Sequence, residues 1–273
     1  GGVVPQGFLH SKEATDVRRL LAERFEIAEI CLFPDGIFAV SDHESAVLIG
    51  RRLSDRQTPR GSLRYCRVRE PDAESFRQAF KVTTERRVPQ SRFTADKAWD
   101  MRIPDLEEVW AWLATAPRMS SVARVAQGLT YKGKGLPVGS LTVSDHHFLG
   151  GVRGFAKWDS SIQIHDQPQE VWMSLDPAVI QRPRSGTTTG APQVLLNYHP
   201  VSRGPWRLKA IVDHAGHAVI SSFLTVGPRT ADFTLDFLWG LCNSPLANAY
   251  AYSYLLKRNI QAGTMRQMPL PAI

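Results

Sequence analysis

Apolar positions in the first fifty residues follow the spacing of one helix and of several short strands. Residues 27–33 and 45–50 are mostly apolar runs of strand length, and residues 34–36 between them have the composition of a turn. Ahead of these runs, Ser11 is suited to cap a helix whose apolar face consists of Ala14, Val17, Leu20, Leu21 and Phe25. Apolar strands around one amphipathic helix predict part of an α/β sheet that is covered on both faces.

The pattern is less regular in the next part of the chain. A strand is predicted near residues 63–68 and a helix near residues 72–80. A clearer helix begins at residues 103–106, with Pro104 in the first helical position, and Pro117 ends it.

The composition changes after residue 117, where we expect a domain boundary. A short helix is predicted near residues 120–125, and short strands and glycine-containing turns follow it. The predicted strands are 171–175, 193–198, 206–213 and 218–225. The last two are expected to form a hairpin across residues 214–217, and two helices capped by Thr230 and Ser244 end the chain.

Composition describes a folded protein of 273 residues, with 43% apolar and 22% charged positions. Three cysteines without a CxxC pair argue against a disulfide framework or a thiolate zinc site, and they favour a reducing, cytoplasmic location. The apolar runs are too short and too often interrupted by charge to span a bilayer, so we expect no membrane partner.

Positive charge exceeds negative charge, since 33 Lys and Arg residues stand against 26 Asp and Glu residues and the formal charge is +7. This balance is compatible with a polyanionic partner, although many basic proteins bind no nucleic acid. The placement of the positive charge is more informative, because basic residues are concentrated in a glycine-rich turn and around a later loop. The residues concerned are Lys132, Lys134, Arg182, Arg184, Arg203, Arg207 and Lys209.

One short run offers metal-ligand chemistry. Asp145, His146 and His147 resemble the signature of a metal-dependent phosphoesterase family. Such sites need further carboxylates, and the sequence holds no matching set, so hydrogen-bonded loop histidines are the favoured interpretation and we expect no metal site. The turn at residues 133–139 lacks the spacing of a nucleotide-binding loop; its amides and lysines are suited either to a phosphate or to a plain turn.

Two separated stretches resemble the same family. Residues 3–9, 30–34, 37–38 and 46–49 resemble the last third of the catalytic domain of adenine-N6 DNA methyltransferases, which has a VVP-type strand, a helix, a strand, a phenylalanine-bearing loop and a further apolar strand. Residues 192–198, 206–210, 241–248 and 268–271 resemble the target-recognition domain of type I and type IIG restriction–modification enzymes.

The resemblance implies a mixed α/β fold in which a partial Rossmann-like methyltransferase sheet edge is followed by an α+β recognition domain. The expected domains are the C-terminal portion of the catalytic domain (1–57), a connector with a strand and helices (58–117) and the recognition domain (118–273). The sequence has neither the FxGxG-type loop for S-adenosylmethionine nor the NPP[YF] tetrapeptide, which in the family lie upstream of the VVP-type segment. We therefore expect a C-terminal fragment without catalytic residues, whose full-length parent binds S-adenosylmethionine.

The resemblance also suggests roles for individual residues. Phe38 occupies the family's position for stacking on a flipped adenine, and its alternative role is that of a core aromatic. The seven basic residues named above would neutralise phosphates of double-stranded DNA and read guanine edges, with Tyr131 as a further base or sugar contact. Expected partners are this DNA and either the N-terminal catalytic part or other restriction–modification subunits. A phosphoesterase using Asp145, His146 and His147, or a protein-interaction module, remains the alternative.

Overall fold

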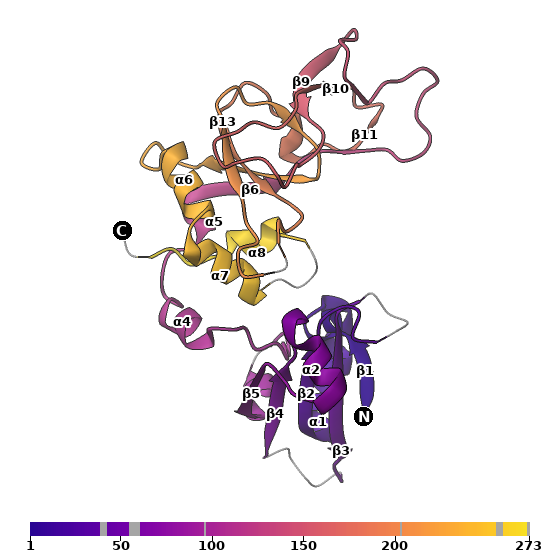
Figure 1. The fold of residues 1–273 in the computed structure, drawn as a ribbon, viewed down its shortest axis with the longest axis vertical. Coiled ribbons are helices and arrows are strands. Elements are labelled where there is room, and N and C mark those ends of the chain that lie inside the picture. Colours follow the sequence, from indigo (N-terminus) through magenta and orange to yellow (C-terminus); the bar gives the residue numbers. More distant parts are fainter. Residues whose placement is uncertain (39–42, 55–60, 96, 203, 255–258, 272–273) are drawn as a thin grey trace. The chain divides into compact units, whose positions relative to one another are not determined.

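The computed structural model describes residues 1–38, 43–54, 61–95, 97–202, 204–254 and 259–271. These residues form two compact units, Gly1–Ile103 and Pro104–Ile273 (Figure 1). Helices and several sheets alternate along the chain, which confirms the expected mixed α/β class. No helix among these residues is both long enough and apolar enough to cross a membrane.

The first unit is built around a five-stranded sheet with the order β1-β3-β2-β4-β5. Strands β2 and β4 run parallel, and every other neighbouring pair is antiparallel. The strands are β1 (Gly2–Pro5), β2 (Phe25–Phe33), β3 (Ser45–Arg52), β4 (Ser62–Arg67) and β5 (Thr84–Pro89). The helices are α1 (Thr15–Arg24), α2 (Ala73–Ala79) and α3 (Ser91–Ala95), with 3₁₀ turns η1 (Gln6–Leu9), η2 (Lys12–Ala14) and η3 (Glu70–Asp72).

Alternating residues of β2 supply the two faces of this sheet. Ile30 belongs to an apolar cluster that includes Leu63 and Phe93, whereas Cys31 belongs to a second cluster with Cys66. This alternation is the period of two that a strand imposes on its side chains. Both faces of β2 are therefore buried, as its nearly continuous apolar sequence predicted.

Helix α1 buries a different stripe from the predicted one. Val17 and Leu20 are 50% and 53% exposed, while Arg18 and Ala22 are buried. Val17 instead lines an apolar pocket of about 380 Å³ that β1 and β3 also line. Ser11 caps η2 without a side-chain hydrogen bond, and α1 itself begins at Thr15. Val17 and Leu20 of the predicted apolar face are thus left exposed by the part of the chain that the structure describes, whereas Leu21 packs against the core cluster that contains Ala22.

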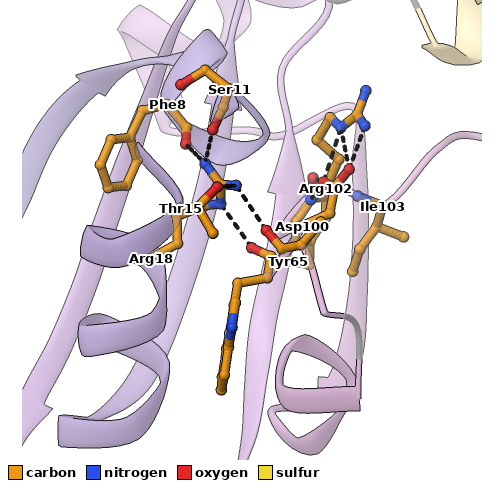
Figure 2. Close-up of polar contacts among 10 residues, drawn as sticks. Phe8, Ser11, Thr15, Arg18, Tyr65, Asp100, Arg102 and Ile103 are labelled. Atoms are coloured by element: carbon orange, nitrogen blue, oxygen red, sulfur yellow. Dashed lines mark hydrogen bonds and ion pairs between the residues drawn. The ribbon is translucent and has the colours of Figure 1, made fainter. Parts of the chain in front are cut away.

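The polar network around Arg18 determines where the first unit ends. Figure 2 shows its guanidinium donating to the carbonyl oxygens of Phe8 (2.9 Å) and Ser11 (2.6 Å) and to the Thr15 hydroxyl (3.2 Å). The same group donates to the carbonyls of residues 98 and 99, at 2.8 and 2.7 Å. Segment 98–103 is thereby held against α1 and belongs to the first unit.

The second unit contains three sheets. A four-stranded antiparallel sheet has the order β13-β12-β15-β6, a second has the order β14-β9-β10-β8, and β11 pairs with β7. The strands are β6 (Ala123–Gln127), β7 (Thr130–Tyr131), β8 (Val143–Ser144), β9 (Gly151–Phe155), β10 (Val171–Ser174), β11 (Ile180–Arg182), β12 (Gln193–Asn197), β13 (Ala210–Asp213), β14 (Ala218–Val219) and β15 (Phe223–Pro228). The helical segments are α4 (Glu107–Trp112), α5 (Met119–Val122), η4 (Arg184–Thr187), α6 (Leu235–Cys242), α7 (Pro245–Tyr254) and α8 (Ala262–Arg266).

The helices of this unit cover one face of its antiparallel sheet. Val194 and Leu196 of β12 share a core with residues of α4, α6, α7 and α8, whereas Leu195 points to a smaller cluster on the other face. The Trp110 ring of α4 lies edge-on to Tyr250 of α7, with ring centroids 5.2 Å apart. Residues 104–117 therefore pack in the second unit, and the compact units divide at 103/104, not near 117 as expected.

Three local predictions for this unit were wrong. Residues 123–125, expected to lie in a helix, belong to β6, because all five residues of β6 pair with β15. The expected hairpin across 214–217 does not form, since β13 pairs with β12 while β14 pairs in parallel with β9. The cap of α6 is Thr234, whose side chain accepts a hydrogen bond from the Phe237 amide, and not Thr230.

Candidate nucleic-acid interface

Two basic segments that are far apart in the sequence lie side by side in the second unit. Strands β7 and β11 are antiparallel, with Thr130 opposite Arg182 and Tyr131 opposite Ile180. The Lys132 amide continues this pairing by donating to the Val179 carbonyl at 2.9 Å. We refer to Tyr131, Lys132, Arg182 and Arg184 as the β7–β11 basic cluster.

Tyr131 and Lys132 are fixed by hydrogen bonds to backbone carbonyls. The Tyr131 hydroxyl donates to the Ser174 carbonyl at 2.9 Å, and burial raises the pKa of Tyr131 to about 12. The Lys132 ammonium donates to the Ala178 carbonyl at 2.6 Å. Both side chains therefore have defined positions, and Lys132 keeps further donors for an anion because an ammonium has three.

Arg184 lies in the 3₁₀ turn η4 with an unusual backbone conformation. Its φ is +46°, in the left-handed region that L-residues other than Asn and Asp seldom adopt. Its guanidinium donates to the Gln127 side chain at the end of β6, and the residue is exposed. The turn therefore presents a cation at a position fixed by the sheet.

Glycine at position 186 allows this turn to lie against the sheet. A Cβ atom there would be 2.1 Å from the Leu129 amide nitrogen and 2.2 Å from the Val219 carbonyl oxygen. Such contacts leave room only for hydrogen, so the backbone approach requires glycine. The basic, hydroxyl-rich composition of residues 182–190 gives no indication of this anchor.

The other predicted DNA contacts are dispersed. Lys134 is exposed in the turn after β7. Lys209 donates from its ammonium to the Ser160 and Ile162 carbonyls at 2.6 and 2.7 Å, so it holds the loop at 160–162. The Arg207 guanidinium lies 4.7 Å from the centroid of the Tyr252 ring of α7.

Arg207 and Lys209 also lie at a different edge of the four-stranded sheet from Arg184. Arg207 and Lys209 lead into β13 at one edge of the four-stranded sheet, whereas Arg184 contacts β6 at the opposite edge. Arg203 lies outside the described residues. The structure thus brings Tyr131, Lys132, Arg182 and Arg184 together, and it does not bring Arg207 and Lys209 to them.

A further cation that the sequence reading missed lies on β9. Arg153 is opposite Trp172 of β10, with its guanidinium 4.6 Å from the indole centroid, and it forms an ion pair with Glu170 at 3.2 Å. His147 contacts the same indole edge-on at 4.5 Å. No sequence motif predicts the stacking of Arg153 and His147 on Trp172, because these contacts depend on the pairing of strands β9 and β10.

Phe38, the predicted base-stacking residue, follows β2 in the first unit. Its ring is half-buried and meets Phe33 edge-on, with centroids 5.8 Å apart. It also packs against the cluster around Cys31 and Cys66. This environment suits a core aromatic, while the ring's remaining exposed surface leaves the stacking role as a proposal.

Asp145, His146 and His147, the residues of the alternative metal site, do not form a group with converging ligand atoms. Asp145, His146 and His147 are all exposed, and His147 is engaged with Trp172. Within the described ranges, the only group of at least three His, Cys, Asp or Glu side chains with ligand atoms within 4.8 Å of one another is Glu29, Cys31 and Cys66. The phosphoesterase alternative gains no support from this geometry.

Comparison with known proteins gives the following picture. No protein-family model matches the sequence, and no curated protein matches it. Solved structures that resemble the chain include the modification subunit assigned to a type I restriction enzyme from Vibrio vulnificus YJ016, with 20% identity, a TM-score of 0.27, and coverage of 33% of this chain and 22% of that one.

Two further structures come from the same class of systems. A chain of a type I restriction–modification system has 20% identity and a TM-score of 0.29, covering 41% of this chain and 31% of that one. The type IIG restriction endonuclease BpuSI has 11% identity and a TM-score of 0.37, covering 99% of this chain and 40% of that one. The chain thus spans less than half the length of each, and TM-scores below 0.5 do not assign a function.

Proposed function

We propose that this chain is the DNA-recognition part of an adenine-N6 DNA methyltransferase from a restriction–modification system. The first unit supplies elements in the order that the sequence motifs imply. These are strand β1, helix α1, strand β2, a loop that contains Phe38, and strand β3. Because β1 and β2 are both antiparallel to β3, the first two run in the same direction.

The observation that carries the proposal is the assembly of the β7–β11 basic cluster. Arg182 and Arg184 are exposed, and Lys132 lies on the segment paired with β11, opposite Val179. Cations in fixed positions can contact successive phosphates, and an arginine can also donate two hydrogen bonds to a guanine edge. A rigid basic surface of this kind suits duplex DNA better than a small anion.

The chemistry of methyl transfer is proposed to lie outside this chain. S-adenosylmethionine would bind the parent enzyme through the motifs that this sequence lacks, and the target adenine would be held there. Phe38 would then stack on the extruded base, since an enzyme that modifies a base must take it out of the duplex. The partners of this chain would be double-stranded DNA and the catalytic part or other subunits of the system.

The apolar pocket of the first unit supports a partner of this kind. It is lined by β1, α1 and β3, and Val3, Val17 and Ile49 nearby are 60%, 50% and 45% exposed. β1 is also an edge strand, which offers backbone groups for pairing. Large exposed apolar surface beside an open sheet edge is typical of a face that another element covers.

Charge reversal in the basic cluster tests the proposal. We expect the Arg182→Glu/Arg184→Glu variant to bind a pool of random-sequence duplexes at least tenfold more weakly than the unmodified chain at moderate salt. The slope of log K against log salt should fall by about 2, because each lost phosphate contact contributes about 0.9. Fluorescence anisotropy of labelled duplexes over a range of KCl concentrations measures both quantities.

A matched control separates local contacts from net charge. Lys12→Glu/Arg19→Glu changes the net charge by the same amount at two exposed positions of the first unit. We expect its affinity to stay within about twofold of the unmodified chain. Equal weakening by both variants would show that only overall charge matters, and absence of salt-dependent binding in the unmodified chain would contradict the proposal.

One observation favours the alternative of a protein-interaction module. Val138 and Leu149, between β7 and β9, are almost fully exposed, and Leu141 is 50% exposed. A protein partner would cover such side chains. In that case the same titrations would show no dependence of DNA affinity on Arg182 and Arg184.

A further inference from the structure

Two thiols and a carboxylate converge on one face of the first unit's sheet. Cys31 of β2 is the register partner of Cys66 of β4, and Glu29 precedes Cys31 by two positions, on the same face. One oxygen of Glu29 and the two sulfur atoms all lie within 4.8 Å of one another. Cys31 and Cys66 are 3% and 0% exposed, while the Glu29 side chain is 24% exposed.

We propose that Glu29, Cys31 and Cys66 bind a zinc-type divalent metal ion through two thiolates and one carboxylate. The class of metal follows from the donors, because thiolate ligands select zinc over the hard cations magnesium and calcium. Tetrahedral zinc with bonds of about 2.3 Å to sulfur separates two sulfurs by about 3.8 Å. The two sulfur atoms lie within 4.8 Å of each other, which is compatible with that spacing.

A metal ion can bridge two thiols on neighbouring strands, which lie about 4.8 Å apart. The fourth ligand would be water, which can enter from the side where Glu29 is exposed.

Arg64 provides the support that a metal-binding carboxylate needs. Its guanidinium donates to Oε2 of Glu29 at 3.0 Å and to Oε2 of Glu85 at 2.7 Å. A carboxylate has two oxygens, so Glu29 can keep this hydrogen bond and offer Oε1 to the metal. Such outer contacts orient ligands in known metal sites.

The surroundings of the thiols set the proton balance of binding. Burial raises the pKa of Cys31 to about 12 and that of Cys66 to about 11, so both sulfurs carry protons at neutral pH. Coordination replaces these two S–H bonds by metal–sulfur bonds and releases two protons to the buffer. Phe33, Val68 and Phe76 belong to the apolar cluster around the thiols.

Cobalt substitution tests this site directly, and its outcome does not depend on DNA binding. Co²⁺ is added to the 273-residue chain with its thiols kept reduced by a phosphine. We expect a near-ultraviolet thiolate-to-cobalt absorption and visible bands of tetrahedral cobalt that saturate at one ion per chain. Zn²⁺ should displace the cobalt and abolish the bands.

Variants of the three proposed ligands and of Cys242 test which residues bind the cobalt. Cys31→Ser and Cys66→Ser should each lose the thiolate absorption, and Glu29→Gln should weaken cobalt binding at least tenfold while circular dichroism shows an unchanged fold. Cys242→Ser is the matched control, since Cys242 is buried alone in the second unit, and its spectrum should equal that of the unmodified chain. Absence of the bands at tenfold excess of cobalt, or bands that survive both ligand-cysteine substitutions, would overturn the proposal.

Discussion

At the scale of single residues, Arg18 shows how backbone carbonyls can accommodate a buried charge. It is 1% exposed, and its guanidinium donates to four backbone carbonyls and to the Thr15 hydroxyl. A planar group with five donors can satisfy several buried carbonyls at once. Arg18 therefore joins α1 to the turn before it and to segment 98–99.

Replacement of this arginine should cost the first unit much of its stability. We expect Arg18→Met to lower the free energy of unfolding by roughly 3–5 kcal/mol, the size observed when one partner of a buried charged network is removed. The carbonyls of Phe8, Ser11 and residues 98–99 would then lose the hydrogen bonds from the guanidinium. Urea unfolding followed by circular dichroism measures the change.

The adjacent residue provides the control for this experiment. Arg19 is half-exposed and forms only a 3.6 Å ion pair with Asp16, so Arg19→Met should change stability by no more than about 0.5 kcal/mol. If the two variants unfold at the same urea concentration, the carbonyl network does not stabilise the fold.

At the scale of elements, the turn η4 connects the basic cluster to the sheet. Gly186 approaches the backbones of Leu129 and Val219 so closely that a side chain cannot be placed there. Arg184, two residues earlier, inherits its position from this contact and from its bond to Gln127. The contact at Gly186 therefore both stabilises the turn η4 and fixes the position of Arg184.

A methyl group at position 186 should therefore affect both the stability of the second unit and its DNA affinity. We expect Gly186→Ala to destabilise the second unit by about 3 kcal/mol, at the upper end of the cost of overpacking, because the neighbouring atoms are backbone and cannot rotate away. The same variant should bind duplex DNA more weakly, since η4 must move. Gly133→Ala, with open space around its Cβ position, should leave stability and DNA affinity unchanged.

Short elements also mark the limit of what the sequence could predict. The strands β2 and β3 were predictable because long apolar runs need burial on both faces. The strand at residues 123–127 was not predictable, because five residues are too few to show a helical or strand period. Its strand conformation depends on pairing with β15. After β13, the amides of Gly216 and His217 donate to the Asp213 carboxylate, and the chain leaves for another sheet instead of closing a hairpin.

At the scale of the whole molecule, the candidate site was predictable in composition but not in arrangement. Excess charge and its clustering indicated Lys132, Arg182 and Arg184 from the sequence alone. Which cations share a surface depends on long-range pairing of β7 with β11, and no local pattern encodes that. Lys209, equally basic in sequence, holds a loop through two carbonyls.

The proposed separation of DNA recognition from methyl transfer leads to a prediction for the 273-residue chain. With methyl-labelled S-adenosylmethionine and duplex DNA, we expect no label in the DNA above a protein-free blank. The reason is chemical, since methyl transfer needs a site that binds the donor and a site that holds the adenine amino group, and the sequence lacks both motifs. Scintillation counting of the purified DNA measures the transfer, with an active adenine methyltransferase as the positive control.

The same sample must still bind DNA for this result to support the proposal. Anisotropy measured alongside should show salt-dependent affinity that falls in the Arg182→Glu/Arg184→Glu variant, because phosphate contacts need no methyl donor. Binding without transfer is the behaviour of a recognition part separated from its catalytic part. Label on adenine would instead mean that this chain contains its own donor site, and loss of both activities would favour a module that binds protein.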